Sequence, residues 1–290
     1  MIVQSNTRRT LIGIVLVCTA AALSPVVIAL VQVLSPRYGN QQLVWARQLS
    51  HLLFLLVVFG PKLGVEVIRT RQLKWQLLRS ALLLGTTLLL YAGVRLLPLA
   101  KSTSINLTGP LFVALLAGPL LHERLGWPRI LAVAIGLMGA LLVIRPTSGM
   151  FHPASLLIVG ASLCYALFQI TTRFVGRVDR PETSAVYSVL VGTVLLSLYV
   201  PFAWSPLQSL SDATLMFMLG ILGGFGHYCL ARGLVYAPVS VAAPFIYVQM
   251  VVAIVIGYIG RGEVPDRDTA IGALLIVAAG VFLTWKETRR

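Results

Sequence analysis

Long apolar segments follow one another along almost the whole chain, and they constrain the fold more than any other feature. They cover residues 10–34, 41–60, 75–97, 101–121, 127–145, 153–175, 182–204, 212–236, 238–260 and 267–285. Each is apolar on all sides, as a helix in lipid should be, and about 20 such residues cross the hydrocarbon core of a bilayer. Membrane β-strands have about 10 residues and alternate apolar with polar, which these segments do not. The sequence predicts an all-α membrane protein with ten transmembrane helices.

Composition supports the same fold class. Of the 290 residues, 58% are hydrophobic and 11% are charged, whereas a soluble domain carries about 25% charged residues. The net charge of +14 raises the possibility of nucleic-acid binding. That function usually needs a basic face on a soluble fold, and here the basic residues are scattered between apolar segments. We expect a small-molecule substrate and membrane lipid as partners, no nucleic acid, and a monomer or homodimer.

The distribution of Lys and Arg predicts the orientation. With the N-terminus in the cytoplasm, 16 of the 23 basic residues fall on the cytoplasmic side and 6 outside, and Arg47 lies within the second segment. This bias follows the positive-inside rule and places both termini in the cytoplasm. The first apolar segment continues to about Leu34, too far for a signal peptide, so we read it as an uncleaved helix.

A weak internal repeat relates the two halves. One set of residues recurs at a shift of 137 and a second set at a shift of 140. These are Tyr91, Arg95 and Ala100 with Tyr228, Arg232 and Ala237, and Glu123, Ala132 and Ala140 with Glu263, Gly272 and Gly280. Five helices per repeat is an odd number, so the halves must have opposite orientations in the membrane. This is the inverted-repeat plan of many secondary carriers.

Two stretches carry a family resemblance. Residues 97–146 and 231–283 each show a small residue, a mid-helix proline and a Glu at the helix end, preceded by Gly262 in the second half and by His in the first. Together with the segments WARQL and CYALFQITTR, they resemble EamA-type carriers of the drug/metabolite transporter superfamily. The resemblance implies EamA-like five-helix repeats at 1–148 and 149–290, a central cavity between them, and a bacterial inner-membrane location. Similar carriers transport amino acids, S-adenosylmethionine, riboflavin or other metabolites.

The carboxylates all fall in predicted loops or helix ends. They are Glu66, Glu123, Asp179, Glu182, Asp212, Glu263, Asp266, Asp268 and Glu287. Carriers of cations or protons commonly place an acid inside the membrane. The pattern therefore favours an anionic, zwitterionic or neutral substrate.

Arg47 is the most deeply placed charge, about six residues into the second predicted helix. A guanidinium in lipid is costly, so it should face protein or a wet cavity. It could hold a substrate carboxylate or phosphate as a fork. The alternatives are a structural bond to a helix-end carbonyl and snorkelling to the surface.

Other polar side chains extend the candidate site. In each of two pairs, Tyr91 with Arg95 and Tyr228 with Arg232, the residues are four positions apart and share a helix face. The arginines could gate the two mouths of the cavity or simply anchor the helix ends.

His51 and His227 could bind substrate or a proton near neutral pH, or serve only as structural histidines. Prolines 25, 110 and 244 kink helices and free carbonyls beside a cavity. The complete substrate-binding prediction is Arg47, Tyr91, Asn106, Thr108, Tyr165, Gln169, His227, Tyr228, Tyr247 and Gln249, with Pro25, Arg95, Pro110, Arg232 and Pro244 at kinks or gates.

These patterns predict a secondary transporter that moves a small polar metabolite, amino-acid-like and zwitterionic or anionic, by alternating access. The alternative is a carrier of a nucleoside-like or flavin-like cofactor such as S-adenosylmethionine or riboflavin, and an integral-membrane enzyme ranks behind both. We expect no catalytic residues, no metal and no cofactor, because no paired acids, metal-ligand spacing or nucleophile beside a base is visible. A phosphate-binding glycine motif for ATP is also missing from the sequence.

Overall fold

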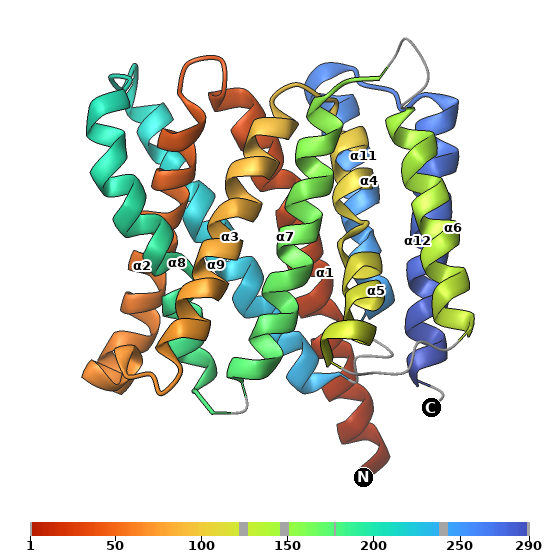
Figure 1. Ribbon diagram of the computed structural model, residues 1–290, viewed down its shortest axis with the longest axis horizontal. Helices are drawn as coiled ribbons and strands as arrows, with labels where there is room; N and C mark the ends of the chain where they lie inside the picture. The colour runs from red at the N-terminus through yellow and green to blue at the C-terminus, as the bar shows by residue number, and fades with distance from the viewer. Residues whose placement is uncertain (1, 122–126, 146–150, 177, 238–242, 289–290) are drawn as a thin grey trace.

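The protein is an all-helical bundle whose helices lie side by side along one direction (Figure 1). A computed structural model describes residues 2–121, 127–145, 151–176, 178–237 and 243–288. Within these ranges the helices are α1 (Ile2–Leu34), α2 (Asn40–Leu63), α3 (Leu73–Val94), α4 (Leu99–Asn106), α5 (Gly109–Leu121), α6 (Trp127–Ile144), α7 (Ala154–Val175), α8 (Pro181–Tyr199), α9 (Leu210–Tyr236), α11 (Val248–Arg261) and α12 (Arg267–Thr288). Short 3-10 helices are η1 (Gly64–Ile68), η2 (Val200–Ala203) and η3 (Ala243–Tyr247).

These helices account for the ten apolar segments of the sequence. The fourth segment is α4 followed by α5, and the ninth is η3 followed by α11. Seven of the described helical stretches are long and apolar enough to cross a membrane, and two shorter ones, Ile130–Ile144 and Phe245–Arg261, are also apolar. The chain is a multi-pass membrane protein, as its composition predicted. The predicted boundary between residues 148 and 149 lies outside the described residues.

The two chain termini lie at the same end of the bundle (Figure 1). We call this the terminal end, and it also carries the connections from α2 to α3 and from α7 to α8. The opposite end carries the connections around residues 35–39, 95–98, 200–209 and 262–266. Because each long helix runs from one end to the other, a residue's position in it fixes its depth. The shorter helices α4, α5 and α11 each cover only part of that distance.

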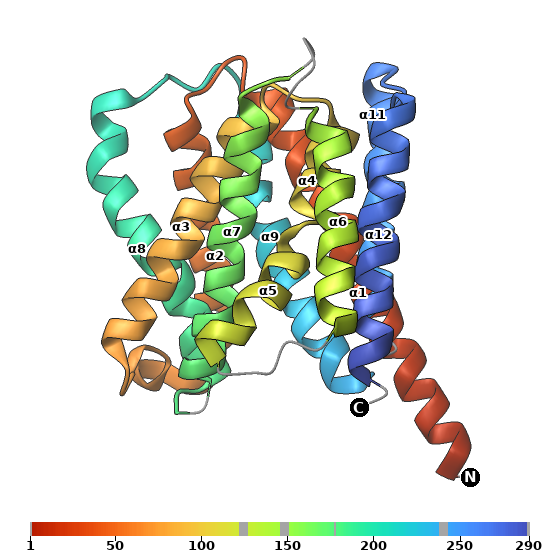
Figure 2. The ribbon, with the colours of Figure 1, turned by 45° about the vertical axis from the view of Figure 1, so that its right-hand side comes forward.

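Helix packing pairs distant parts of the chain (Figure 2). The most extensive contacts join α3 with α7, α1 with α9, and α6 with α12, and α2 packs against both α8 and α9. Two glycines permit close approaches within these pairs. A Cβ at Gly233 on α9 would lie 2.7 Å from the Val17 side chain of α1, and one at Gly93 on α3 would lie 3.0 Å from the Ala154 carbonyl of α7. Small residues commonly mark such approaches in membrane bundles.

Polar ties hold the opposite end together. Arg145, after α6, forms ion pairs of 2.7 Å with Asp266 and 3.0 Å with Asp268 at the start of α12. Glu263 accepts a 2.9 Å hydrogen bond from the backbone N–H of Leu99 and so caps the first turn of α4. Asp212 of α9 accepts a bond of 2.7 Å from the Tyr38 hydroxyl of the α1–α2 connection.

A second polar cluster lies at the terminal end. Asp179, between α7 and α8, accepts hydrogen bonds from the Arg71 backbone and the Gln76 amide, each at 3.0 Å, and from the Thr70 hydroxyl. These donors outweigh the effect of burial, which alone would raise the pKa, and they lower the pKa of Asp179 below its usual value. Arg79 extends this cluster inward through Thr172, at 2.7 Å.

Candidate functional site

A cavity of about 280 Å³ lies inside the bundle. Its walls come from α1, α2, α3, α7, α9, α11, η3 and the junction of α4 with α5. Most of the lining is aliphatic. The polar or titratable lining residues are Ser24, Arg47, Thr86, Thr87, Tyr91, Asn106, Tyr165, Gln169, His227 and Gln249. A mostly apolar cavity with a few converging polar groups is the usual form of a small-molecule site.

Arg47 supplies the positive charge of this cavity. It lies two turns into α2, is 9% exposed, and donates a long bond of 3.3 Å from Nη1 to the Thr87 hydroxyl of α3. Within the described part of the chain no carboxylate pairs with it, and each described carboxylate lies at a helix end or in a connection. A buried guanidinium without a counter-ion attracts an anionic group.

Glycines of α9 create the space for Arg47. A Cβ at Gly223 would lie 3.4 Å from Arg47 Nη2, and one at Gly224 would lie 2.7 Å from the imidazole of His51. At Gly220, a Cβ would collide with the backbone of Arg47 and His51. The glycines therefore let α2 approach α9 closely enough to aim Arg47 at the cavity.

Tyr91 is buried in the cavity wall at 1% exposure. Its hydroxyl has no hydrogen-bond partner among the described residues, and it lies close enough to Arg47 for the two groups to interact electrostatically. A buried hydroxyl without a partner costs free energy. Tyr91 is therefore prepared to bond a polar group of a bound solute beside Arg47.

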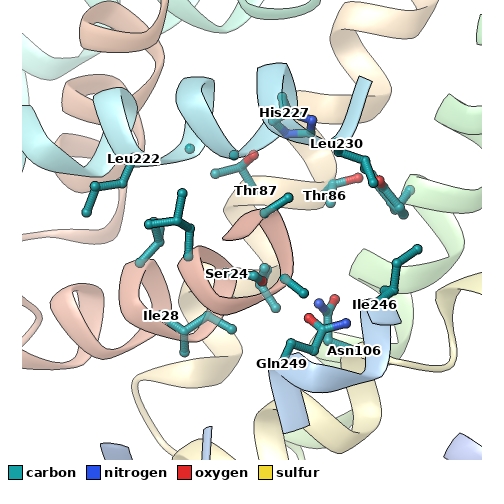
Figure 3. A pocket seen from close by; sticks show the side chains of 18 of the residues that line it. Ser24, Ile28, Thr86, Thr87, Asn106, Leu222, His227, Leu230, Ile246 and Gln249 are labelled. Atoms are coloured by element: carbon teal, nitrogen blue, oxygen red, sulfur yellow. The ribbon is translucent and has the colours of Figure 1, made fainter. Parts of the chain in front are cut away.

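Amide groups line another part of the cavity. Figure 3 shows the side chains of Asn106 and Gln249 close together, with His227, Thr86 and Thr87 at a different part of the wall. Gln169 donates a 3.2 Å bond to the hydroxyl of Tyr165, one turn away on α7. Amides can donate and accept hydrogen bonds, so this part of the site suits a neutral polar or heterocyclic group.

Interrupted helices place these amides at mid-depth. The chain leaves the helix after Asn106, and α5 begins at Gly109 with Pro110 in its first turn, where proline needs no backbone N–H. Asn106 and Pro110 both line the cavity. On the other side, η3 gives way to α11 just before Gln249. Irregular backbone at membrane depth is tolerated where it lines a cavity.

Three residues predicted to bind substrate do not line the cavity. Thr108 bonds the Ile105 carbonyl at 2.7 Å within the α4–α5 junction. Tyr228 is 38% exposed and is not part of the lining, although the neighbouring His227 is. Tyr247 is buried against α12, where its ring occupies the space that a side chain at Gly280 would need.

The predicted gating residues have structural contacts. Arg95 donates a 2.7 Å bond from Nη2 to the Ser35 carbonyl after α1, and Arg232 contacts its own helix through the Tyr236 hydroxyl at 3.2 Å. The first contact matches the alternative of a helix-end tie. Helix α1 continues through Pro25, whose neighbour Ser24 lines the cavity. Pro244 falls within η3.

Apart from Tyr91, the cavity residues of α3 were not predicted from the sequence. Leu83, Thr86, Thr87 and Leu90 line the cavity together with Tyr91. Both threonines are buried, and both hydroxyls also bond carbonyls one turn back in the helix. The signal was the sequence Gly85-Thr86-Thr87, a small polar interruption in an otherwise aliphatic segment.

Sequence comparison relates this chain to transporters. The model of the EamA-like transporter family matches twice, at residues 11–145 and 152–285. A riboflavin transporter of Vibrio cholerae is 27% identical over 84% of this chain and 82% of its own. An S-adenosylmethionine uptake transporter of Rickettsia prowazekii is 26% identical over 81% of this chain and 80% of its own.

Structural comparison gives the same fold. A crystal structure matches 98% of this chain and 100% of its own, with a TM-score of 0.68 and 19% sequence identity. At this identity the likeness concerns the arrangement of the helices and not the solute that is bound. The bundle and its interrupted helices therefore belong to an architecture already observed in a solved protein.

Proposed function

Because the chain belongs to the EamA-like transporter family, and is a metabolite transporter and not an enzyme, we propose that it is a secondary carrier of a small zwitterionic or anionic metabolite. The observation that carries this substrate class is the unpaired Arg47 in the cavity wall. Its guanidinium would hold a carboxylate or phosphate through two hydrogen bonds, and the Tyr91 hydroxyl would complete the contact.

The cavity volume is consistent with a small solute. Ligand pockets usually measure about 300–1,000 Å³, so a cavity of about 280 Å³ lies at the lower limit. An amino acid fits this description, with its carboxylate at Arg47. The amides of Asn106 and Gln249 would then bond the remaining polar atoms.

A second candidate is a nucleoside-like or flavin-like cofactor. Relatives at 26% and 27% identity favour it, since they are named as transporters of S-adenosylmethionine and riboflavin. The Tyr165 ring and the nearby amides could stack on and bond a heterocycle. S-adenosylmethionine combines the two candidates, because it has an amino-acid carboxylate as well as a purine.

Transport would follow from two inverted five-helix repeats that rock about this cavity. The packing supports this plan. If each helix of the first five passes is replaced by its counterpart in the last five, and the reverse, the observed helix–helix contacts correspond to one another. The contact of α3 with α7 becomes that of α9 with α1, and the contact of α2 with α9 becomes that of α8 with α3. The two separate family matches also divide the chain near residue 148. Alternating access usually has this symmetry.

We place the carrier in the bacterial inner membrane with its terminal end in the cytoplasm. The excess of Lys and Arg around the termini and the α2–α3 and α7–α8 connections supports this orientation. The ion pairs of Arg145 and Asp212 would then close the outer side.

Counterflow in liposomes tests the proposal. Vesicles containing the purified protein are loaded with unlabelled solute and given the same labelled compound outside, using glutamate, methionine, S-adenosylmethionine and riboflavin in turn. We expect saturable counterflow with at least one carboxylate-bearing compound. Arg47→Gln should weaken its apparent affinity about tenfold or more, because hydrogen bonds to charged groups contribute about 1.5–3 kcal/mol.

The matched control is Arg69→Gln, which removes an exposed arginine whose ion pair among the described residues is with Glu66. It should leave the affinity unchanged. Equal affinity of the Arg47→Gln variant and the wild type would remove Arg47 from the site. Counterflow of riboflavin alone, unaffected by the substitution, would favour the second candidate.

A further inference from the structure

Two histidines from different helices stack inside the bundle. His51 of α2 and His227 of α9 have ring centroids 5.8 Å apart and an interplanar angle of 15°. His227 lines the cavity, whereas His51 lies behind it at 4% exposure. The Nδ1 atom of His51 has no hydrogen-bond partner among the described residues. The pair is thus a buried titratable group with direct access to the cavity.

The surroundings of the pair are positively charged. Arg47 precedes His51 by four residues on α2, so the two share a helix face. Arg47 and Arg79 of α3 both act electrostatically on His227. The other titratable residues that line the cavity are Tyr91 of α3 and Tyr165 of α7, and a tyrosine hydroxyl is ordinarily neutral near pH 7. The helices packed around the pair also carry Cys18 on α1 and Tyr187 on α8, whose hydroxyl donates to the Ile68 carbonyl.

No described carboxylate lies at this depth to balance these charges. A proton on the histidine pair would therefore be repelled by the positive charge of Arg47, with no nearby negative charge to offset the repulsion. An anionic group bound at Arg47 would remove that repulsion. Histidine is the side chain that ordinarily changes charge between about pH 5 and pH 8. Burial and the charge of Arg47 disfavour the proton in the empty cavity, so its binding depends on the bound anion.

We propose that the His51–His227 pair is a proton-binding site and that a proton is carried together with the anionic group of the substrate. This inference rests on the function proposed above and identifies its coupling ion. Binding of the anion at Arg47 favours the proton on the pair, and the proton in turn favours the anion, because linkage between two sites is reciprocal. The carrier would then move with both ligands or with neither.

The experiment separates coupling from transport itself. Liposomes that contain the full-length protein receive an imposed gradient of one pH unit, alkaline inside, with the membrane potential clamped by potassium and valinomycin. Accumulation of labelled glutamate, methionine, S-adenosylmethionine and riboflavin is measured beside counterflow at equal pH. One proton per solute predicts about tenfold accumulation of the transported compound, since one pH unit equals about 1.4 kcal/mol.

Two variants locate the coupling site. His227→Gln keeps a hydrogen-bonding side chain but cannot hold the proton, so accumulation should fall from about tenfold to the unstimulated level. Exchange needs no net proton movement, so its counterflow should continue, but with a changed apparent affinity, because His227 lines the cavity. His152→Gln is the matched control. This histidine lies at the opposite end, where its Nδ1 accepts a bond from the backbone N–H of Ala154, and its loss should leave accumulation at about tenfold.

Each result has a defined meaning. Loss of accumulation with retained counterflow in His227→Gln supports the proton site. Wild-type counterflow without any response to the pH gradient overturns it and leaves the proposed function standing, as does full accumulation by His227→Gln. A parallel loss of both activities in His227→Gln assigns the histidine a structural role and also overturns the inference. Wild-type protein that exchanges none of the four compounds contradicts the proposed function, and the inference falls with it.

Discussion

Arg47 on α2 faces Gly223 on α9 so closely that a Cβ at Gly223 would lie 3.4 Å from the guanidinium Nη2. The charge in the cavity therefore depends on the missing side chain of another helix. Gly220 and Gly224, on the same stretch of α9, are packed even more tightly against α2. Together the three glycines set the distance between the helix that carries Arg47 and the helix that carries His227.

Gly220→Ala should destabilise the protein and shift Arg47. The added Cβ would collide with the Arg47 carbonyl and the His51 backbone nitrogen, and backbone atoms cannot move aside as a flexible side chain can. Overpacking of this kind typically costs about 1–3 kcal/mol. We expect a lower Tm in detergent and weaker binding of the transported solute. Gly226→Ala is the control for stability, because its Cβ would meet atoms only at 3.8–3.9 Å; an equal Tm for the two variants would contradict the packing argument.

The family and the helices could be predicted from the sequence. The apolar segments agree with the observed helices to within a few residues except at the N-terminus, where 10–34 became Ile2–Leu34. The resemblance seen in residues 97–146 and 231–283 is confirmed by the family match. Length and hydropathy determine these features, because the backbone of a spanning segment must form its hydrogen bonds within the protein, and apolar segments of this length do so as helices.

The inward faces of the helices could not be predicted in the same way. His227 lines the cavity and Tyr228 does not, although they are adjacent in the sequence. In water the polar face of a helix marks its outside, but in lipid both the core and the surroundings are apolar. For the same reason, Thr86 and Thr87 could not be recognised from the sequence as cavity residues. The interruption of the fourth helix at Leu107 and Thr108 was also missed, although the neighbouring Pro110 was noticed.

Tyr91→Phe should weaken substrate binding without destabilising the protein. The Tyr91 hydroxyl has no hydrogen-bond partner among the described residues, and Tyr91 lines the cavity. Removal of the hydroxyl therefore breaks no hydrogen bond among these residues and eliminates an unsatisfied buried group. If the hydroxyl bonds the solute, affinity should fall roughly two- to tenfold, from the loss of about 0.5–1.5 kcal/mol. Counterflow kinetics and Tm measure the two effects. An unchanged apparent affinity would show that the solute does not reach Tyr91.

Arg79→Gln should lower the stability of the protein, whereas Arg47→Gln should not. Arg79 bonds the Thr172 hydroxyl at 2.7 Å and the Ser184 carbonyl, and its guanidinium lies 4.5 Å from the Phe168 ring centroid. These contacts tie α3 to α7 and α8, so their loss should cost about 2–3 kcal/mol of stability. Arg47→Gln removes an unpaired buried charge and should leave Tm unchanged or higher. A larger drop in Tm for Arg47→Gln than for Arg79→Gln would reverse these roles.

Acidification should weaken the ties at the opposite end of the bundle. Burial alone would raise the pKa of Asp266, but hydrogen bonds from Thr269 and the charges of Arg145 and Lys101 outweigh it and lower the pKa below its usual value. A carboxyl with a lowered pKa in the folded state contributes stability above its unfolded pKa of about 3.9. That contribution is lost as the pH falls through the folded pKa.

Asp266→Asn tests this linkage. The side chain of Asp266 is half exposed, so we expect the variant to lose only about 0.5–1 kcal/mol at pH 7. Its Tm should therefore lie slightly below that of the wild type at pH 7, and the two values should converge as the pH falls from about 5 toward 3. Glu66→Gln is the control, since it breaks only an exposed pair with Arg69. A difference in Tm between Asp266→Asn and the wild type that stays constant down to pH 3 would mean that the charge of Asp266 does not hold α12 to Arg145.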